Sequence, residues 1–192
     1  MSTVGSWNVN IEMGALPQKI ATAFDKLGEE LIGAEYTAIA YLGSQVVNGT
    51  NHAVLAEQTV LAGKDTKNIV LVIFNEKADV VTLVNIERVV EGGGELGGND
   101  VNVQTDIPDE AKAAFDSSFA GFVGSTVKPV ALLATKVTKG TSYVFVAEVA
   151  PVVPDPEKKV AIVAVNGMTK DVAFADLLTS KLNGSLGYAF NW

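Results

Sequence analysis

The segment Tyr36–Leu61, YTAIAYLGSQVVNGTNHAVLAEQTVL, predicts the fold more strongly than any other part of the sequence. It contains two runs of strand-forming residues, 36–47 and 50–61, on either side of Asn48-Gly49. Asn-Gly is a strong signal for a β-hairpin, because both residues tolerate the positive φ angles of a type I′ turn. The segment therefore predicts two long antiparallel strands joined by a tight turn.

A helix is predicted before this hairpin, and further strands are predicted around it. The helix begins at Pro17, where proline is well tolerated, and ends near Gly33. Its apolar residues have the spacing of one face of an amphipathic helix: Ile20, Phe24, Leu27 and Leu31. Three more strands are predicted: Val9–Met13, Asn68–Phe74 and Val80–Val89.

The same pattern recurs 91 residues later in the chain. Along the hairpin, five residues have identical counterparts: Leu42, Val46, Gly49, Thr50 and Glu57 recur as Leu133, Val137, Gly140, Thr141 and Glu148. A constant offset of this kind predicts two copies of one supersecondary unit. We predict a first unit over residues 1–91, a glycine-rich linker over 92–100 and a second unit over 101–192.

The second unit repeats the order of elements. Its helix is expected to begin at Pro108 and to present Phe115, Phe119 and Phe122 on one face. Four strands are predicted to follow: 130–137, 143–149, 159–165 and 172–178. The pattern of the last segment also fits a helix. The tail 182–192 has no counterpart in the first unit and is expected to add a strand.

These elements predict the α+β class, with one helix packed on a four- to five-stranded antiparallel sheet in each unit. Two of the strands, Ile69–Phe74 and Val160–Val165, are apolar at successive positions instead of alternating with polar residues. A sheet with one face in water should alternate. We therefore expect the second face of each sheet to be covered, by the other unit or by another chain.

Composition excludes several classes of partner and site. The chain of 192 residues is acidic, with a net charge of −8 and a pI near 4.6, which disfavours nucleic acid and anionic membrane surfaces. It has no cysteine, which excludes disulfides and thiol chemistry. The first residues resemble no secretory signal, and we expect a cytoplasmic location.

We predict no enzyme, no catalytic residues, no metal and no cofactor. His52 is the single histidine and is expected to be solvated or half-buried on a strand. Gly92, Gly94 and Gly97 match the G-x-G-x-x-G pattern of dinucleotide-binding loops. That reading requires a helix directly after the glycines, whereas an extended stretch follows here. We interpret the glycines as linker.

Residues Gln45–Asn51, with the sequence QVVNGTN, resemble the first-hairpin motif Q-x-V-x-G of the cystatin and stefin family. Gly14, before the helix, resembles the glycine of the family's N-terminal trunk. The resemblance implies a tandem duplication of a cystatin-like unit. It also implies reversible inhibition of papain-like cysteine peptidases, in which the trunk and two hairpins form a wedge.

The protein-binding residues that this resemblance implies are Gly14, Gln45, Val46, Val47, Asn48 and Gly49. A second hypothesis is a protein-binding or assembly module without a peptidase target, which allows a homo-oligomer. A third is a small-molecule pocket between helix and sheet. We rank it last, because the apolar stripe of the helix offers no convergent polar groups.

Overall fold

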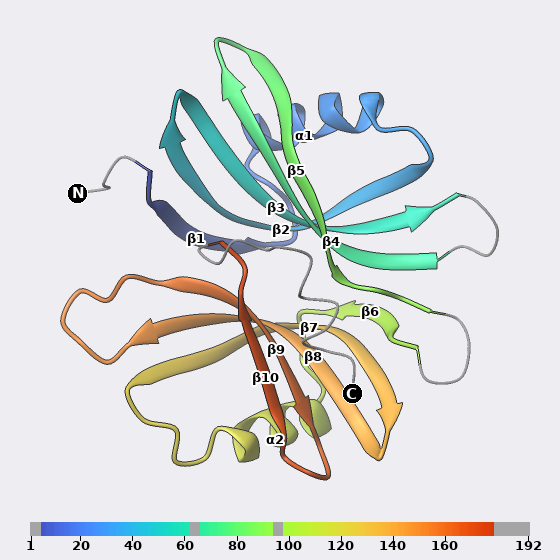
Figure 1. The fold of residues 1–192 in the computed structure, drawn as a ribbon, viewed down its shortest axis with the longest axis vertical. Coiled ribbons are helices and arrows are strands. Elements are labelled where there is room, and N and C mark those ends of the chain that lie inside the picture. Colours follow the sequence, from blue (N-terminus) through green and yellow to red (C-terminus); the bar gives the residue numbers. More distant parts are fainter. Residues whose placement is uncertain (1–4, 62–65, 94–97, 179–192) are drawn as a thin grey trace. The chain divides into compact units, whose positions relative to one another are not determined.

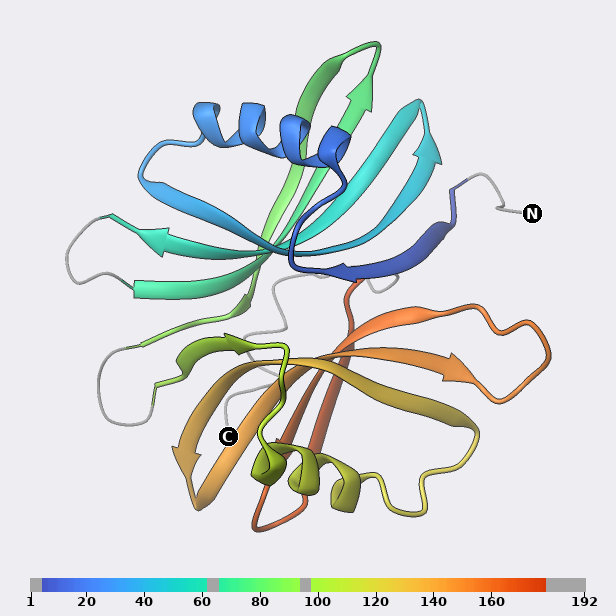
Figure 2. The same cartoon turned by 180° about the vertical axis from the view of Figure 1, so that it is seen from behind.

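The computed structural model describes residues 5–61, 66–93 and 98–178 (Figures 1 and 2). The chain divides into two compact units, Met1–Val89 and Val90–Trp192. The elements of the first unit are β1 (Trp7–Met13), α1 (Gln18–Glu30), β2 (Ala34–Val47), β3 (Gly49–Val60), β4 (Thr66–Lys77) and β5 (Val80–Val90). Its sheet has the order β1-β2-β3-β4-β5, so each strand is hydrogen-bonded to its neighbours in sequence.

The second unit has the same order of elements: β6 (Asp100–Gln104), α2 (Asp109–Ser118), β7 (Ser125–Thr138), β8 (Gly140–Pro151), β9 (Lys159–Asn166) and β10 (Val172–Asp176). Its five strands are again neighbours in sequence order. The first residues of α2, β7 and β8 each lie 91 positions after those of α1, β2 and β3. The offset read from side chains therefore also relates the elements of the two units.

The predicted fold class is wrong. Strands make up 59% of the chain and helices only 14%, so the fold is rich in β-structure and does not belong to the α+β class. Several strands are longer than expected: β4 extends beyond the predicted 68–74 at both ends, and β7 and β8 extend beyond the predicted 130–137 and 143–149. Figures 1 and 2 show how short each helix is beside the strands of its own unit.

Helix α1 contributes one face to the main core of the first unit. Ile20, Ala23, Phe24 and Leu27 are buried there together with Val54, Ala56, Val70, Val72 and Phe74 from the central strands. The helix follows Pro17 and ends at Glu30, three residues before Gly33, whose φ of +92° reverses the chain toward β2. The amphipathic pattern thus predicted both the helix and its buried face.

Helix α2 is shorter than its sequence suggests. It ends at Ser118, and Phe119 caps it with a φ of −99°. Phe115 is buried in the second core and Phe119 packs against it, but Phe122 lies beyond the helix and is 56% exposed. The expectation that Phe122 belongs to the buried helix face is wrong, because Gly121 turns the chain with a φ of +84°.

Central strands are buried on both faces, as the absence of alternation predicted. Val54 and Val72 point into the cluster that contains α1, whereas Leu55 and Leu71 occupy the alternate positions of the same strands. All four side chains have 0% exposure. Two-sided burial explains why these strands are apolar at successive positions.

Segment 172–178, for which strand and helix were both open, contains strand β10 paired antiparallel with β9. Of the predicted linker, Gly92 forms an isolated bridge with Asn99, and Asp100 already belongs to β6. Residues 94–97 and the tail 182–192 lie outside the described residues. In the part of the chain that the structure describes, neither helix is long and apolar enough to cross a membrane.

Candidate functional site

The candidate site is the tip of the β2–β3 hairpin. Strand pairing continues to Val46↔Thr50 and Val47↔Gly49, which leaves Asn48 alone at the turn. Val46 is 52% exposed and Val47 is 39% exposed. Five of the six predicted site residues are therefore contiguous at this tip, where two apolar side chains face solvent.

A row of side-chain amides crosses the sheet just behind the tip. Gln45 donates from Nε2 to the carbonyl of Gly5, and its Oε1 accepts from Asn51 Nδ2; both distances are 2.8 Å. Asn51 Oδ1 in turn accepts from Asn75 Nδ2 at 2.8 Å. This amide row links the segment before β1 to β2, β3 and β4, so the tip of β2 and β3 is fixed to two neighbouring segments.

Gly49 is the residue at the tip that tolerates no side chain. Its φ is +100°, a conformation that favours glycine. A Cβ atom added there would lie 2.7 Å from the carbonyl oxygen of Glu76 and 2.8 Å from Asn75 Oδ1. The tip thus packs directly on the end of β4, and the glycine allows this approach.

The sixth predicted residue, Gly14, is not at this site. Its amide donates to the carbonyl of Ile39 at 2.9 Å, at the opposite end of β1 from Trp7, which pairs with Gln45. Ile39 and Gln45 are six positions apart on β2, a distance of about 20 Å. Gly5 lies beside the tip instead, since its amide donates to the carbonyl of Val46 at 3.1 Å. The sequence pattern contained no signal for Gly5, because the register of β1 against β2 is set in the folded sheet.

The turn between β4 and β5 lies next to the tip. Glu76 pairs with Thr50 of β3, so β4 extends two residues into what the sequence suggested was a loop. Ala78 and Asp79 form the turn with φ values of +49° and +63°. The two hairpins end on the same side of the unit (Figure 1). Val80, the first residue of β5 after this turn, is 62% exposed.

The second unit has an equivalent tip with different side chains. Val137 is 78% exposed, and Gly140 has a φ of +89°. Asn166, the counterpart of Asn75, donates from Nδ2 to Thr138 Oγ1 at 3.1 Å and to Ser142 Oγ at 3.0 Å. Both units thus use an asparagine to hold the hairpin, but only the first has the glutamine.

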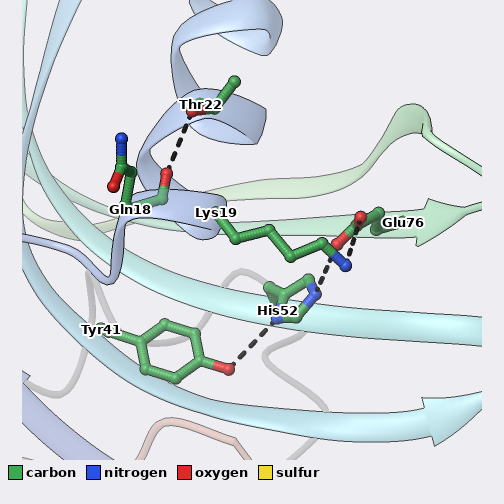
Figure 3. A network of polar contacts seen from close by, with 6 residues as sticks. All are labelled: Gln18, Lys19, Thr22, Tyr41, His52 and Glu76. Carbon is green, nitrogen blue, oxygen red and sulfur yellow. Dashed lines mark hydrogen bonds and ion pairs between the residues drawn. The ribbon is translucent and has the colours of Figure 1, made fainter.

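Beneath the tip of the first unit lies a network of polar contacts that the sequence did not predict (Figure 3). Lys19 Nζ of α1 is 2.8 Å from Glu76 Oε1, and His52 Nε2 is 3.4 Å from Glu76 Oε2. The other ring nitrogen, His52 Nδ1, is 3.1 Å from the hydroxyl of Tyr41. Glu76 lies beyond the predicted strand Asn68–Phe74 and belongs to this network.

Burial decides the charge of His52. The side chain was expected to be solvated or half-buried, but only 7% of the residue is exposed. Burial lowers the pKa of His52 below its ordinary value of 6.5, and the opposing effect of Glu76 is smaller. The hydrogen bond from Lys19 lowers the pKa of Glu76. The network therefore contains a neutral imidazole and an ionised carboxylate at neutral pH, enclosed by sheet and helix.

Comparisons with models of known protein families and with curated proteins find no match for this chain. Among residues 5–61, 66–93 and 98–178, no group of three or more His, Cys, Asp or Glu side chains could hold a metal ion.

Proposed function

We propose that the protein is a protein-binding module that presents the β2–β3 tip to a cleft on its partner. The observation that carries this proposal is the combination of exposed and immobilised residues at one point. Val46 and Val47 are exposed at 52% and 39%, while the amide row behind them spans three strands and the segment before β1.

Physical chemistry favours binding by such a tip. Apolar area removed from water contributes about 25 cal/mol per Å², so two valines supply a modest anchor. A tip already held by hydrogen bonds loses little conformational entropy on docking, which improves affinity for a given contact area. The chain has no cysteine and needs no oxidising compartment, which supports a cytoplasmic setting as part of this proposal.

A papain-like cysteine peptidase is the partner that one further observation favours. Gly5, the tip and the β4–β5 turn lie next to one another at the same end of the strands, and the tip has the Q-V-V-N-G sequence. A narrow cleft accepts a glycine-containing turn closely, because backbone can approach where side chains cannot. Titration of papain tests this candidate: absence of inhibition at micromolar concentrations would remove it.

The general proposal has a test that does not depend on papain. In Val46→Asp/Val47→Asp, two exposed side chains become charged, which should leave the fold intact. Val137→Asp makes the same change at the tip of the second unit and serves as the matched control. Quantitative affinity capture from cells that contain the protein should identify a partner whose recovery falls about tenfold with the double variant.

The same partner should be recovered normally with Val137→Asp. If every captured protein binds wild type and the double variant equally, the tip is not a binding site. A second copy of the chain is one partner that this proposal includes. Light scattering of wild type and of the double variant would identify it as a loss of mass in the variant.

A further inference from the structure

The second unit contains a cavity that the first unit fills with its own side chains. It has a volume of about 560 Å³ and lies between α2, the start of β8 and the turn after β9. The side chains on its walls include those of Glu110, Ala113, Ala114, Tyr143, Met168 and Lys170. The equivalent cavity in the first unit measures about 190 Å³.

The offset of 91 residues explains the difference in volume. Glu76, which occupies the space in the first unit, corresponds to Gly167, and Lys26 corresponds to Ser117. Two long charged side chains are therefore replaced by a glycine and a serine. The larger cavity results from these substitutions on a shared backbone arrangement.

Charges on the walls are also exchanged between the units. In the first unit the helix contributes Lys19, which is paired with Glu76, and the turn after the strand contributes Asp79. In the second unit the helix contributes Glu110, and the turn contributes Lys170 at the position of Asp79. A carboxylate and an ammonium thus lie on two different walls of an open cavity.

Polar groups also line the cavity. Tyr143 lies on its wall with Glu110; burial is the main reason that the pKa of Tyr143 is raised, and the charge of Glu110 adds to this effect. Lys170 Nζ donates to the carbonyl of Gly167 at 2.8 Å. An ammonium has three N–H groups, so this bond orients the lysine and leaves donors for a ligand. Met168 and the two alanines supply apolar contact.

We propose that this cavity binds a small aliphatic zwitterion, with its ammonium at Glu110 and its carboxylate at Lys170. A volume of about 560 Å³ is within the range of small-molecule sites and accommodates a free amino acid or a short peptide. On the sequence alone a small-molecule pocket ranks last, because the apolar stripe of the helix offers no polar groups. Glu110 and Ser117 are exposed and lie outside that stripe, so they can contribute polar groups to the cavity.

The test is a nuclear magnetic resonance titration of the full chain with 6-aminohexanoate. Amide signals of Gly140, Gly167 and Lys170 should shift with a saturable dependence on concentration. Hexylamine and hexanoate each carry one of the two charges and should bind more weakly. The proposal would be overturned if hexylamine or hexanoate bound as tightly as 6-aminohexanoate. It would also be overturned if the shifts were spread over the surface and did not saturate.

Variants separate the site from general electrostatic effects. Glu110→Gln and Lys170→Gln should each weaken binding by about fivefold, since exposed ion pairs are partly screened by water. Asp109→Asn and Lys158→Gln are the matched controls, because these residues do not line the cavity. Ala113→Phe, at an exposed helix position, fills the cavity and should abolish binding while the rest of the spectrum is preserved. Unchanged affinity in Glu110→Gln or Ala113→Phe would refute the site.

Discussion

Lys19 of α1 and Glu76 of β4 form an ion pair of 2.8 Å above the buried ring of His52. The Lys19 ammonium is mostly exposed, whereas Glu76 and His52 are enclosed by the sheet (Figure 3). The pair therefore stands at the boundary between solvent and core. It connects the helix to the strand on which the hairpin tip packs.

Acid should destabilise the first unit through His52. Burial lowers the folded-state pKa of this imidazole below 6.5, so the unfolded chain binds a proton at a higher pH than the folded chain. The neutral His52 ring therefore contributes to the free energy of unfolding above about pH 6.5, and this contribution is lost as the pH falls toward the folded-state pKa of His52. Urea unfolding of wild type and His52→Phe between about pH 7 and about pH 5 should show a smaller loss of stability in the variant.

Glu76 contributes at lower pH with the same sign. Its folded-state pKa lies below the ordinary 4.5, so its contribution is complete above that value and is lost as the pH falls through the folded pKa. Glu76→Gln should flatten the pH dependence below about pH 4.5; because Glu76 raises the pKa of His52, the same variant should lose more stability than wild type between about pH 7 and about pH 5. If both variants keep the wild-type dependence throughout, other groups dominate the acid response.

Replacing Gly49 by alanine should destabilise the protein by more than its unfavourable φ alone. The added methyl group would lie 2.7 Å from the Glu76 carbonyl oxygen. Gly33 is the matched control, since its φ is +92° and nothing lies within 4 Å of its Cβ position. Gly33→Ala is expected to cost about 1 kcal/mol and Gly49→Ala about 3 kcal/mol in chemical denaturation. Equal losses would show that the tip does not need close contact with β4.

The stability of the hairpin tip should depend on Asn51, because its side chain forms hydrogen bonds with both Gln45 and Asn75 in the amide row. Asn51→Ala breaks both bonds and is expected to reduce the free energy of unfolding by about 1–3 kcal/mol. Hydrogen exchange at the tip should accelerate in the same variant. Asn10→Ala removes an exposed amide contact to Glu12 and should change neither measurement, which separates the row from surface hydrogen bonds in general.

Leu27 should be a major contributor to the core under α1. It is 2% exposed, and Leu27→Ala is expected to cost about 2–5 kcal/mol through lost burial and a residual cavity. Ile32 follows the same helix but is 100% exposed, so Ile32→Ala should stay within about 0.5 kcal/mol of wild type. Thermal or urea unfolding measures both. Similar effects of the two variants would contradict the packing of this helix.

Sequence patterns predicted helices and turns well where the structure depends on residues that are close together in the chain. The hairpin at Asn48-Gly49 and the burial of Ile20, Phe24 and Leu27 are confirmed, because each depends on residues a few positions apart. The type I′ turn is not, since only Gly49 has a positive φ. The class assignment was wrong because strand length was underestimated. Polar residues near the strand ends, such as Glu76, resemble a loop in sequence but remain in the ladder.

Side-chain pairing across the sheet could not be read in the same way. Gly14 was chosen by resemblance, yet antiparallel register places Gly5 beside Gln45. Glu76 lay outside the predicted strand, yet it remains in β4 and pairs with Lys19 of a distant segment. Such contacts join residues that are tens of positions apart, and a sequence pattern contains no direct record of them.

The chain alone was sufficient to establish the repeat, the antiparallel meander and the two-sided burial of its central strands, because hydrophobic patterning and turn chemistry act between near neighbours. Tertiary structure decided which glycine reaches the hairpin tip, why His52 is buried and why the cavity beside the helix is larger in the second unit than at the equivalent place in the first. Each of these depends on how a helix and distant strands meet in space. Two exchanged side chains there, glycine for glutamate and serine for lysine, determine whether the space is filled or open.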